Sequence, residues 1–179
     1  MFSTALLSFQ GSLNDHLYTG PDVLNNLIGI LIRFRQERIA VVGDVEAMYH
    51  RVQVYDEDQP FLRFLWWKDG NIQGPIEEYC MKVQVFGSGP SGFCANTALR
   101  RCADDGIGRF PEHVIKSVHT NFYVDDLLMS LPDEESAADF VNAISRLLAE
   151  GGFRLHKWMS AFLFTKDVAN ERTLPTAHD

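Results

Sequence analysis

The sequence contains no long hydrophobic run. Residues 29–34 already include Arg33, and no segment approaches the roughly 20 apolar residues that are needed to span a bilayer. Residues 1–9 are mildly apolar, but they have no basic flank and no clear cleavage site, so we expect no signal peptide. We therefore expect no membrane partner.

Cysteine is also scarce. The three cysteines, Cys80, Cys94 and Cys102, lie far apart and fit no zinc spacing, and an odd number argues against a disulfide framework. The six histidines show no metal-ligand spacing. The sequence has no glycine-rich phosphate loop that ends in Lys-Ser or Lys-Thr, and no Ser-His-Asp or Cys-His arrangement can be assigned. A reducing compartment is the simplest interpretation.

Positive charge is in deficit. Lysine and arginine total 16 against 24 acidic residues, which gives a net charge of −8, and residues 117–145 contain six acids and no lysine or arginine. Phosphate binding normally leaves a basic footprint. Here basic residues cluster only before residue 39, at Arg33, Arg35 and Arg38, and at Arg100-Arg101. Either the acids serve a cation site, or the chain does not bind nucleic acid.

Two groups of carboxylates stand at the ends of apolar, β-prone segments. Asp125 and Asp126 separate a strand predicted over residues 121–124 from an apolar run over 127–131, which predicts a hairpin with the acids at its tip. Residues 38–44 are a short apolar run that ends on Asp44. Carboxylates placed in this way are costly unless a cation compensates their charge.

The rest of the chain mixes predicted helices and hairpins, in a length that suits one domain with a real core. Apolar spacing predicts helices over residues 23–31, 93–103 and 133–150, the last with Gly151 as its stop. A turn at 68–71 predicts that residues 61–67 and 79–86 pair as strands, before a glycine-rich loop at 87–92. This mixture predicts an α+β fold with helices on one face of an antiparallel sheet.

The order of these elements resembles reverse transcriptases. Tyr-Val-Asp-Asp at 123–126 resembles their active-site hairpin, and Asp44 followed by Tyr49 resembles their first catalytic motif. The ordered set covers roughly residues 11–160. Four segments resemble more narrowly the reverse transcriptase of the Bel/Pao class of LTR retrotransposons: residues 11–17, 19–22, 64–67 and 151–158.

The resemblance implies a polymerase palm-like sheet plus partial fingers over residues 1–164. Residues 165–179 are polar, with Pro175 and no periodicity, which predicts a disordered or artificial tail. It implies RNA-directed DNA polymerisation by two-metal nucleotidyl transfer, with Asp44, Asp125 and Asp126 binding two Mg²⁺ ions, or Mn²⁺ in their place. Partners would be an RNA/DNA template–primer, deoxynucleotides and the rest of a Pol polyprotein, in cytoplasmic virus-like particles.

The same resemblance assigns further site residues. Tyr49 would lie against the sugar of the nucleotide and exclude a ribose 2′ hydroxyl, with Phe86 and Gly87 in the same nucleotide site. Tyr123 either touches the primer backbone or packs. Lys157 is either a general acid for pyrophosphate or a solvated lysine.

The glycine-rich loop departs from the family pattern. Gly92 stands where proline is expected, and Pro90 comes two residues earlier. With the acidic balance and the missing thumb, this departure leaves an alternative: a catalytically inactive, retroelement-derived remnant that acts at most as a binding module.

Overall fold

The computed structural model describes residues 11–162, which form two compact units. Residues 22–48 and 96–162 make up the sheet unit, and residues 11–21 and 49–95 make up the hairpin unit. The predicted tail at 165–179 lies outside the described residues. No helix within residues 11–162 is long and apolar enough to cross a membrane.

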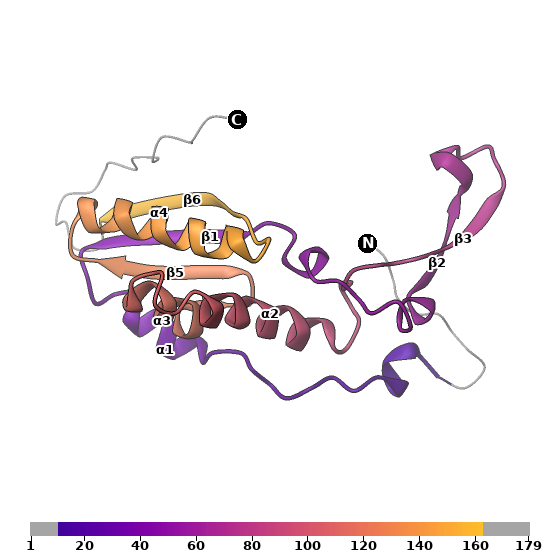
Figure 1. Cartoon of the computed structure of the whole chain (residues 1–179), viewed down its shortest axis with the longest axis horizontal. Coiled ribbons are helices and arrows are strands. Elements are labelled where there is room, and N and C mark those ends of the chain that lie inside the picture. The colour runs from indigo at the N-terminus through magenta and orange to yellow at the C-terminus, as the bar shows by residue number, and fades with distance from the viewer. Residues whose placement is uncertain (1–10, 163–179) are drawn as a thin grey trace. The chain divides into compact units, whose positions relative to one another are not determined.

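The sheet unit is built on one antiparallel sheet in the order β4-β5-β1-β6. Figure 1 shows β5, β1 and β6 side by side. The strands are β1 (Ile39–Val45), β4 (Phe122–Tyr123), β5 (Asp126–Leu131) and β6 (Leu155–Phe162). The helices are α1 (Leu27–Arg33), α2 (Ser91–Asp105), α3 (Glu112–Thr120) and α4 (Glu134–Glu150); α2 begins in the hairpin unit. This is the α+β, palm-like architecture that the sequence predicts.

The central strand β1 follows from its β-branched residues. Val41 and Leu127 lie diagonally to each other on one face of the β1–β5 pair, since their direct partners are Met129 and Gly43. Both side chains are completely removed from solvent, and Val45 on the same face is almost completely buried. Side chains alternate between the two faces of a strand. The buried residues therefore define a core face, and Asp44 lies on the other face.

The helix α4 covers the sheet and contacts β1, β5 and β6 (Figure 1). Asp133 caps its start by accepting a hydrogen bond from the backbone N–H of Ser136 at 2.7 Å, and the helix ends at Gly151. Its buried residues are Ala137, Phe140, Ile144, Leu147 and Leu148. The predicted apolar face is thus confirmed, except that Val141 is only half-buried.

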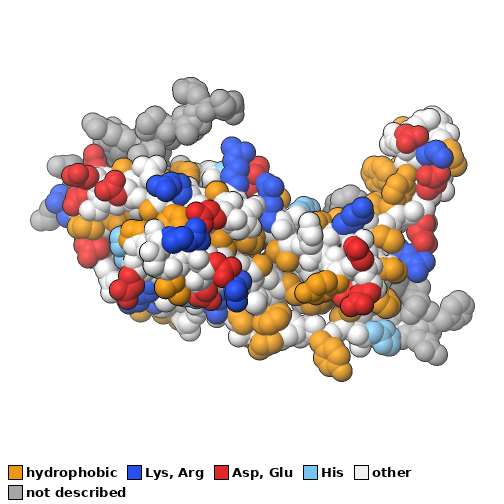
Figure 2. Space-filling model, viewed as in Figure 1, with side chains coloured by type: hydrophobic (Ala, Val, Ile, Leu, Met, Phe, Trp, Pro, Cys, Tyr) orange, Lys and Arg blue, Asp and Glu red, His pale blue; other side chains and the backbone are white. Residues whose placement is uncertain are grey.

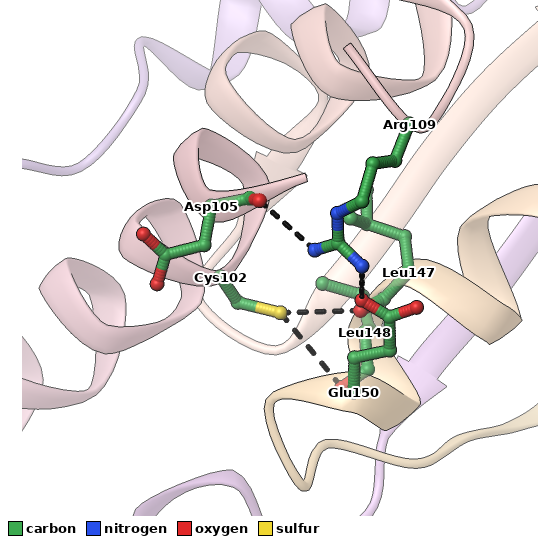
Figure 3. Close-up of polar contacts among 6 residues, drawn as sticks. All are labelled: Cys102, Asp105, Arg109, Leu147, Leu148 and Glu150. Carbon is green, nitrogen blue, oxygen red and sulfur yellow. Dashed lines mark hydrogen bonds and ion pairs between the residues drawn. The ribbon is translucent and has the colours of Figure 1, made fainter. Parts of the chain in front are cut away.

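Polar contacts join the ends of α2 and α4 (Figure 3). Arg109 donates to the backbone carbonyl of Asp105 at 2.9 Å and to the carboxylate of Glu150 at 2.6 Å. The buried Cys102 thiol lies 3.2 Å from the carbonyl oxygen of Leu147. These contacts satisfy carbonyls at helix ends that otherwise have no partner.

The predicted start of the first helix is wrong. The pattern placed it at residue 23, after Pro21-Asp22, whereas α1 begins at Leu27, and Asn26 caps it by accepting from the N–H of Gly29. The preceding residues are held extended by tertiary hydrogen bonds. Arg100 donates to the carbonyl of Val23 at 2.6 Å, and Asn25 donates to the carbonyl of Phe122 at 2.9 Å.

The hairpin unit contains two paired strands, β2 (Arg63–Trp67) and β3 (Ile76–Cys80). Four short 3-10 helices are also present in the described chain: Leu13–His16, Met48–Arg51, Gln59–Phe61 and Lys68–Gly70. Exposed hydrophobic side chains gather on the hairpin (Figure 2), including Leu65, Ile72 and Ile76.

The predicted partner of β2 is displaced along the chain. The alternation over residues 79–86 predicted a strand there, but the strand ends at Cys80, and only Val83 makes a further isolated bridge, to Gln53. Cross-strand pairs set the register earlier: Phe64 stacks on Tyr79, and Lys68 forms an ion pair with Glu77 at 3.0 Å.

Candidate active site

The carboxylates Asp44 and Asp126 lie directly opposite each other on neighbouring strands. In the β1–β5 register their Cα atoms are partners, and the backbone N–H of the next residue, Val45, donates to the carbonyl of Asp125 at 2.9 Å. Residues that face each other across an antiparallel pair project to the same side, and like charges placed there are destabilising. The fold therefore concentrates negative charge at this edge of the sheet.

A tight hairpin presents the acidic pair. Tyr123 pairs with Asp126, so the loop consists of Val124 and Asp125 alone. Val124 has φ 56°, while Asp125 is not among the residues with positive φ, which is the pattern of a type II′ turn. A β-branched residue in this region is strained by roughly 1–2 kcal/mol. The predicted hairpin is confirmed, and its tip is a strained segment.

Two basic side chains from β6 contact Asp44. His156 is the register partner of Asp44 on that side, and its Nε2 donates to Asp44 Oδ1. The ammonium of Lys157 lies 3.5 Å from Asp44 Oδ2. Asp44 is thus flanked by an acid on one neighbouring strand and by basic groups on the other.

A bulge in β6 places Lys157 at this position. The register shifts between Val42, which faces Met159, and Asp44, which faces His156, so β6 carries one extra residue. Lys157 has φ 52° within the bulge. A bulge bends its strand and redirects a side chain. Gly43 is required opposite it, because an added Cβ would lie 2.8 Å from the ring of Trp158.

The charge cluster perturbs Asp126. Burial raises the pKa of this carboxyl above its ordinary value of 3.8, and the neighbouring charges of Asp125 and Asp44 raise it further, whereas Lys157 lowers it. The ionised form of Asp126 is therefore disfavoured when the protein alone surrounds it. A bound cation would reverse this penalty.

The donor chemistry fits a hard divalent ion, but the side chains do not already enclose one. Carboxylate oxygens are the ligands that Mg²⁺ takes in proteins, and Asp44 and Asp126 share one face of the sheet. Within residues 11–162, no group of three or more acidic, histidine or cysteine side chains is arranged as a metal site. Metal binding would require Asp44 to exchange its contacts with His156 and Lys157.

The other predicted nucleotide-site residues belong to the hairpin unit. The rings of Tyr49 and Phe86 meet edge to face with centroids 4.6 Å apart, and Phe86 also contacts His50. Gly87 has φ 88°, a conformation that favours glycine. The roles of Tyr49, Phe86 and Gly87 toward a nucleotide, and of Tyr123 toward a primer, stay predictions.

Asn14 holds the glycine-rich loop. Its amide donates to the carbonyl of Gly87 at 2.7 Å, and its side-chain oxygen accepts from the N–H of Gly89 at 2.8 Å. The helix α2 begins one residue after Pro90, whose carbonyl accepts from the N–H of Cys94 at 2.9 Å. Pro90 thus marks the helix start, and Gly92 lies in the first turn.

Sequence reasoning missed two residues, His156 and Asn14. His156 was interpreted as a surface or core histidine because it shows no ligand spacing, but the register of β6 on β1 brings it to Asp44. The only available signal was a histidine next to a lysine in the segment 151–158 that carries the family resemblance. Nothing in the sequence around Asn14 indicated a partner 73 residues away.

Comparisons with known proteins identify the fold. No protein-family model matches the sequence, and no curated protein matches it significantly. The structure is similar to that of the foamy viral protease–reverse transcriptase in complex with an RNA/DNA hybrid, with a TM-score of 0.55, 16% identity, and coverage of 78% of this chain and 16% of that chain. It is also similar to the selenomethionine-labelled CSH mutant of the prototype foamy virus protease–reverse transcriptase, with a TM-score of 0.60, 16% identity, and coverage of 85% and 18%. The chain therefore spans less than a fifth of the length of these two proteins and has a reverse-transcriptase-like, palm-type α+β fold.

Proposed function

We propose that this chain is the fingers and palm segment of an RNA-directed DNA polymerase from a Bel/Pao-like retrotransposon. The observation that carries the proposal is the pairing of Asp44 with Asp126 across β1 and β5, with Asp125 at the adjacent hairpin tip. The similarity to foamy virus protease–reverse transcriptases supports it at the level of fold. The narrower Bel/Pao assignment rests on the sequence segments alone.

In this proposal Asp44, Asp125 and Asp126 hold two Mg²⁺ ions, for which Mn²⁺ can substitute. The ions would activate the primer hydroxyl and stabilise the leaving pyrophosphate. Asp126, whose pKa is raised by burial and by its acidic neighbours, contributes a carboxylate whose charge the protein alone does not balance. Lys157, which the bulge holds beside Asp44, would hold a proton near a phosphate oxygen as a general acid.

The proposed substrates are a template–primer and deoxynucleotides. Tyr49 would exclude a ribose 2′ hydroxyl, Phe86 and Gly87 would line the nucleotide site, and Tyr123 would contact the primer. One of the two similar foamy viral structures is a complex with an RNA/DNA hybrid, which supports this class of partner. The remaining parts of a Pol polyprotein and a cytoplasmic virus-like particle complete the proposed context.

Metal binding can be tested apart from catalysis. Titration with Mn²⁺, followed by electron paramagnetic resonance of the free ion, should show saturable binding that Asp125→Asn weakens. Asp69→Asn is the matched control, because Asp69 is an exposed turn residue in a left-handed conformation that asparagine tolerates. Equal Mn²⁺ binding by both variants would remove Asp125 from the site.

Primer extension on an RNA template then tests activity, again with Asp125→Asn as the control. Metal-dependent incorporation that disappears in this variant would establish the polymerase. A folded protein that binds Mn²⁺ but incorporates nothing would favour the second candidate, an inactive remnant. That candidate is supported by the net charge of −8 and by the contacts that already occupy Asp44.

A further inference from the structure

A cavity of about 190 Å³ opens in the sheet unit between the end of α1, the helix α3 and the outer part of β5. Its basic lining residues are Arg33, His113 and Lys116, and none of its lining residues is acidic. This is unusual in a chain with a net charge of −8. The cavity reaches β5 at Met129 and Ser130, about 10–13 Å along the strand from Asp126 at roughly 3.3 Å per residue.

Arg33 is the central group. Its Nη2 donates to the backbone carbonyl of Thr120, which fixes the plane of the guanidinium against the end of α3. Its Nε is inaccessible to solvent and, within residues 11–162, is the one buried side-chain nitrogen or oxygen without a hydrogen-bond partner. A buried charged donor without an acceptor is costly. An acceptor supplied by a ligand would remove that cost.

Apart from the exposed Gln36, the neutral polar side chains of the lining donate hydrogen bonds to the protein. Ser117 donates to the carbonyl of Val114 at 2.7 Å, and the hydroxyl of Thr120 lies 2.9 Å from the carbonyl of Lys116. The amide of Asn121 donates to the carbonyl of Leu128 at 2.9 Å. The donors that remain for a ligand therefore come mainly from the basic side chains, which selects for an anion.

His113 and Lys116 supply the second side of the cavity. They lie one turn apart on α3, both are exposed, and neither has an ion-pair partner among the described residues. His113 is held by its ring contact with Phe140, at 6.3 Å between centroids. A planar guanidinium on one side and the flexible ammonium of Lys116 on the other suit a tetrahedral oxyanion better than a single carboxylate.

We propose that this cavity is a binding site for a phosphate group, held by Arg33 and Lys116 with His113 at the rim. The site is separate from the carboxylates at the other end of β5, and it does not depend on the polymerase assignment. The phosphate can belong to a nucleic-acid backbone or to a free phosphate ester, and the chemistry of recognition is the same.

The test is a titration with inorganic phosphate at constant ionic strength, followed in ¹H–¹⁵N spectra. The Nε–H of Arg33 reports binding in the unaltered protein, and the backbone amides of the lining residues Ser117 and Thr120 report it in every variant. We expect a saturable shift. Arg33→Lys keeps the charge but removes Nε, and should weaken binding about tenfold or more; Lys116→Ala should weaken it several-fold. Arg35→Lys, a neighbouring exposed arginine, and Asp125→Asn should leave it unchanged.

Competition then identifies the source of the phosphate. Stronger displacement by an RNA/DNA hybrid than by a mononucleotide at equal phosphate concentration would assign the site to a nucleic-acid backbone, and the reverse order would assign it to a free ester. No saturable shift in a protein with a native circular dichroism spectrum would overturn the proposal. Equal affinities in Arg33→Lys, Lys116→Ala and the unaltered protein would overturn it as well.

Discussion

The left-handed conformation of Lys157 gives a prediction that links backbone strain to the candidate active site. Its φ is 52°, it lies in the bulge of β6, and its ammonium is 3.5 Å from Asp44. Two substitutions separate the two effects. Lys157→Ala removes the charge and keeps a Cβ in the strained conformation, whereas Lys157→Gly removes both.

The magnitudes follow from the structure. The left-handed conformation costs a residue with a Cβ roughly 1–2 kcal/mol, and glycine loses about 0.5–1 kcal/mol through its greater freedom in the unfolded chain. The difference between the midpoints of these two ranges predicts that Lys157→Gly is more stable than Lys157→Ala by about 0.75 kcal/mol. The ion pair lost in both variants is worth about 0–1 kcal/mol, because the lysine side chain is 69% exposed.

Urea denaturation at pH 7 without divalent cations measures this difference, provided that the m-values agree. Met159 offers a matched control in the same strand, since it is exposed and outside the positive-φ residues. There the order should reverse, with Met159→Gly less stable than Met159→Ala. If glycine and alanine were equally stable at position 157, or if glycine were the less stable, the bulge would not hold Lys157 as described.

Three further predictions follow from other parts of the structure. Gly151→Ala should lower the free energy of unfolding by about 1–3 kcal/mol, because the new Cβ would lie 2.5 Å from the thiol of Cys102. Adding Cys102→Ala should recover part of this loss. If the effects of the two substitutions on the free energy of unfolding were strictly additive, the contact would be contradicted. Asp126→Asn should stabilise the metal-free protein at pH 7, because the raised pKa of Asp126 means that its ionisation lowers the free energy of unfolding. That cost is absent below the ordinary pKa of 3.8, so the gain measured by urea denaturation should shrink as the pH falls toward 3.8. A gain independent of pH would argue against the raised pKa. Tyr49→Ala should increase ribonucleotide incorporation relative to deoxynucleotides in primer extension, and an unchanged ratio would mean that Tyr49 only packs against Phe86.

The acidic hairpin shows how far local sequence reasoning reaches. Residues 121–131 predicted two strands around an acidic tip, and the observed strands are Phe122–Tyr123 and Asp126–Leu131. The signal is local because both strands and the turn are contiguous. The positive φ of Val124 carried no sequence signal, since a β-branched residue normally avoids that conformation.

Element boundaries were less predictable where distant residues compete for the backbone. The helix α1 begins four residues later than its apolar spacing predicts, because Arg100 and Asn25 tie residues 23–25 to other elements. The strand β3 is displaced because cross-strand pairs with β2 set its register. Periodicity records which side chains are buried, but it does not record which partners bury them.

The sequence by itself determined the α+β class, the strand that ends at Asp44, the acidic hairpin and the helix α4, because each depends on periodicity, turn residues and caps within one continuous segment. Only the tertiary structure decided that Asp44 faces Asp126 and His156, that a bulge brings Lys157 to the same carboxylate, and that the Nε of Arg33 is buried beside a cavity. The physical reason is that charge interactions and hydrogen bonds depend on distances of a few ångströms between residues far apart in the chain. Strand register and chain packing set those distances, and no local pattern encodes them.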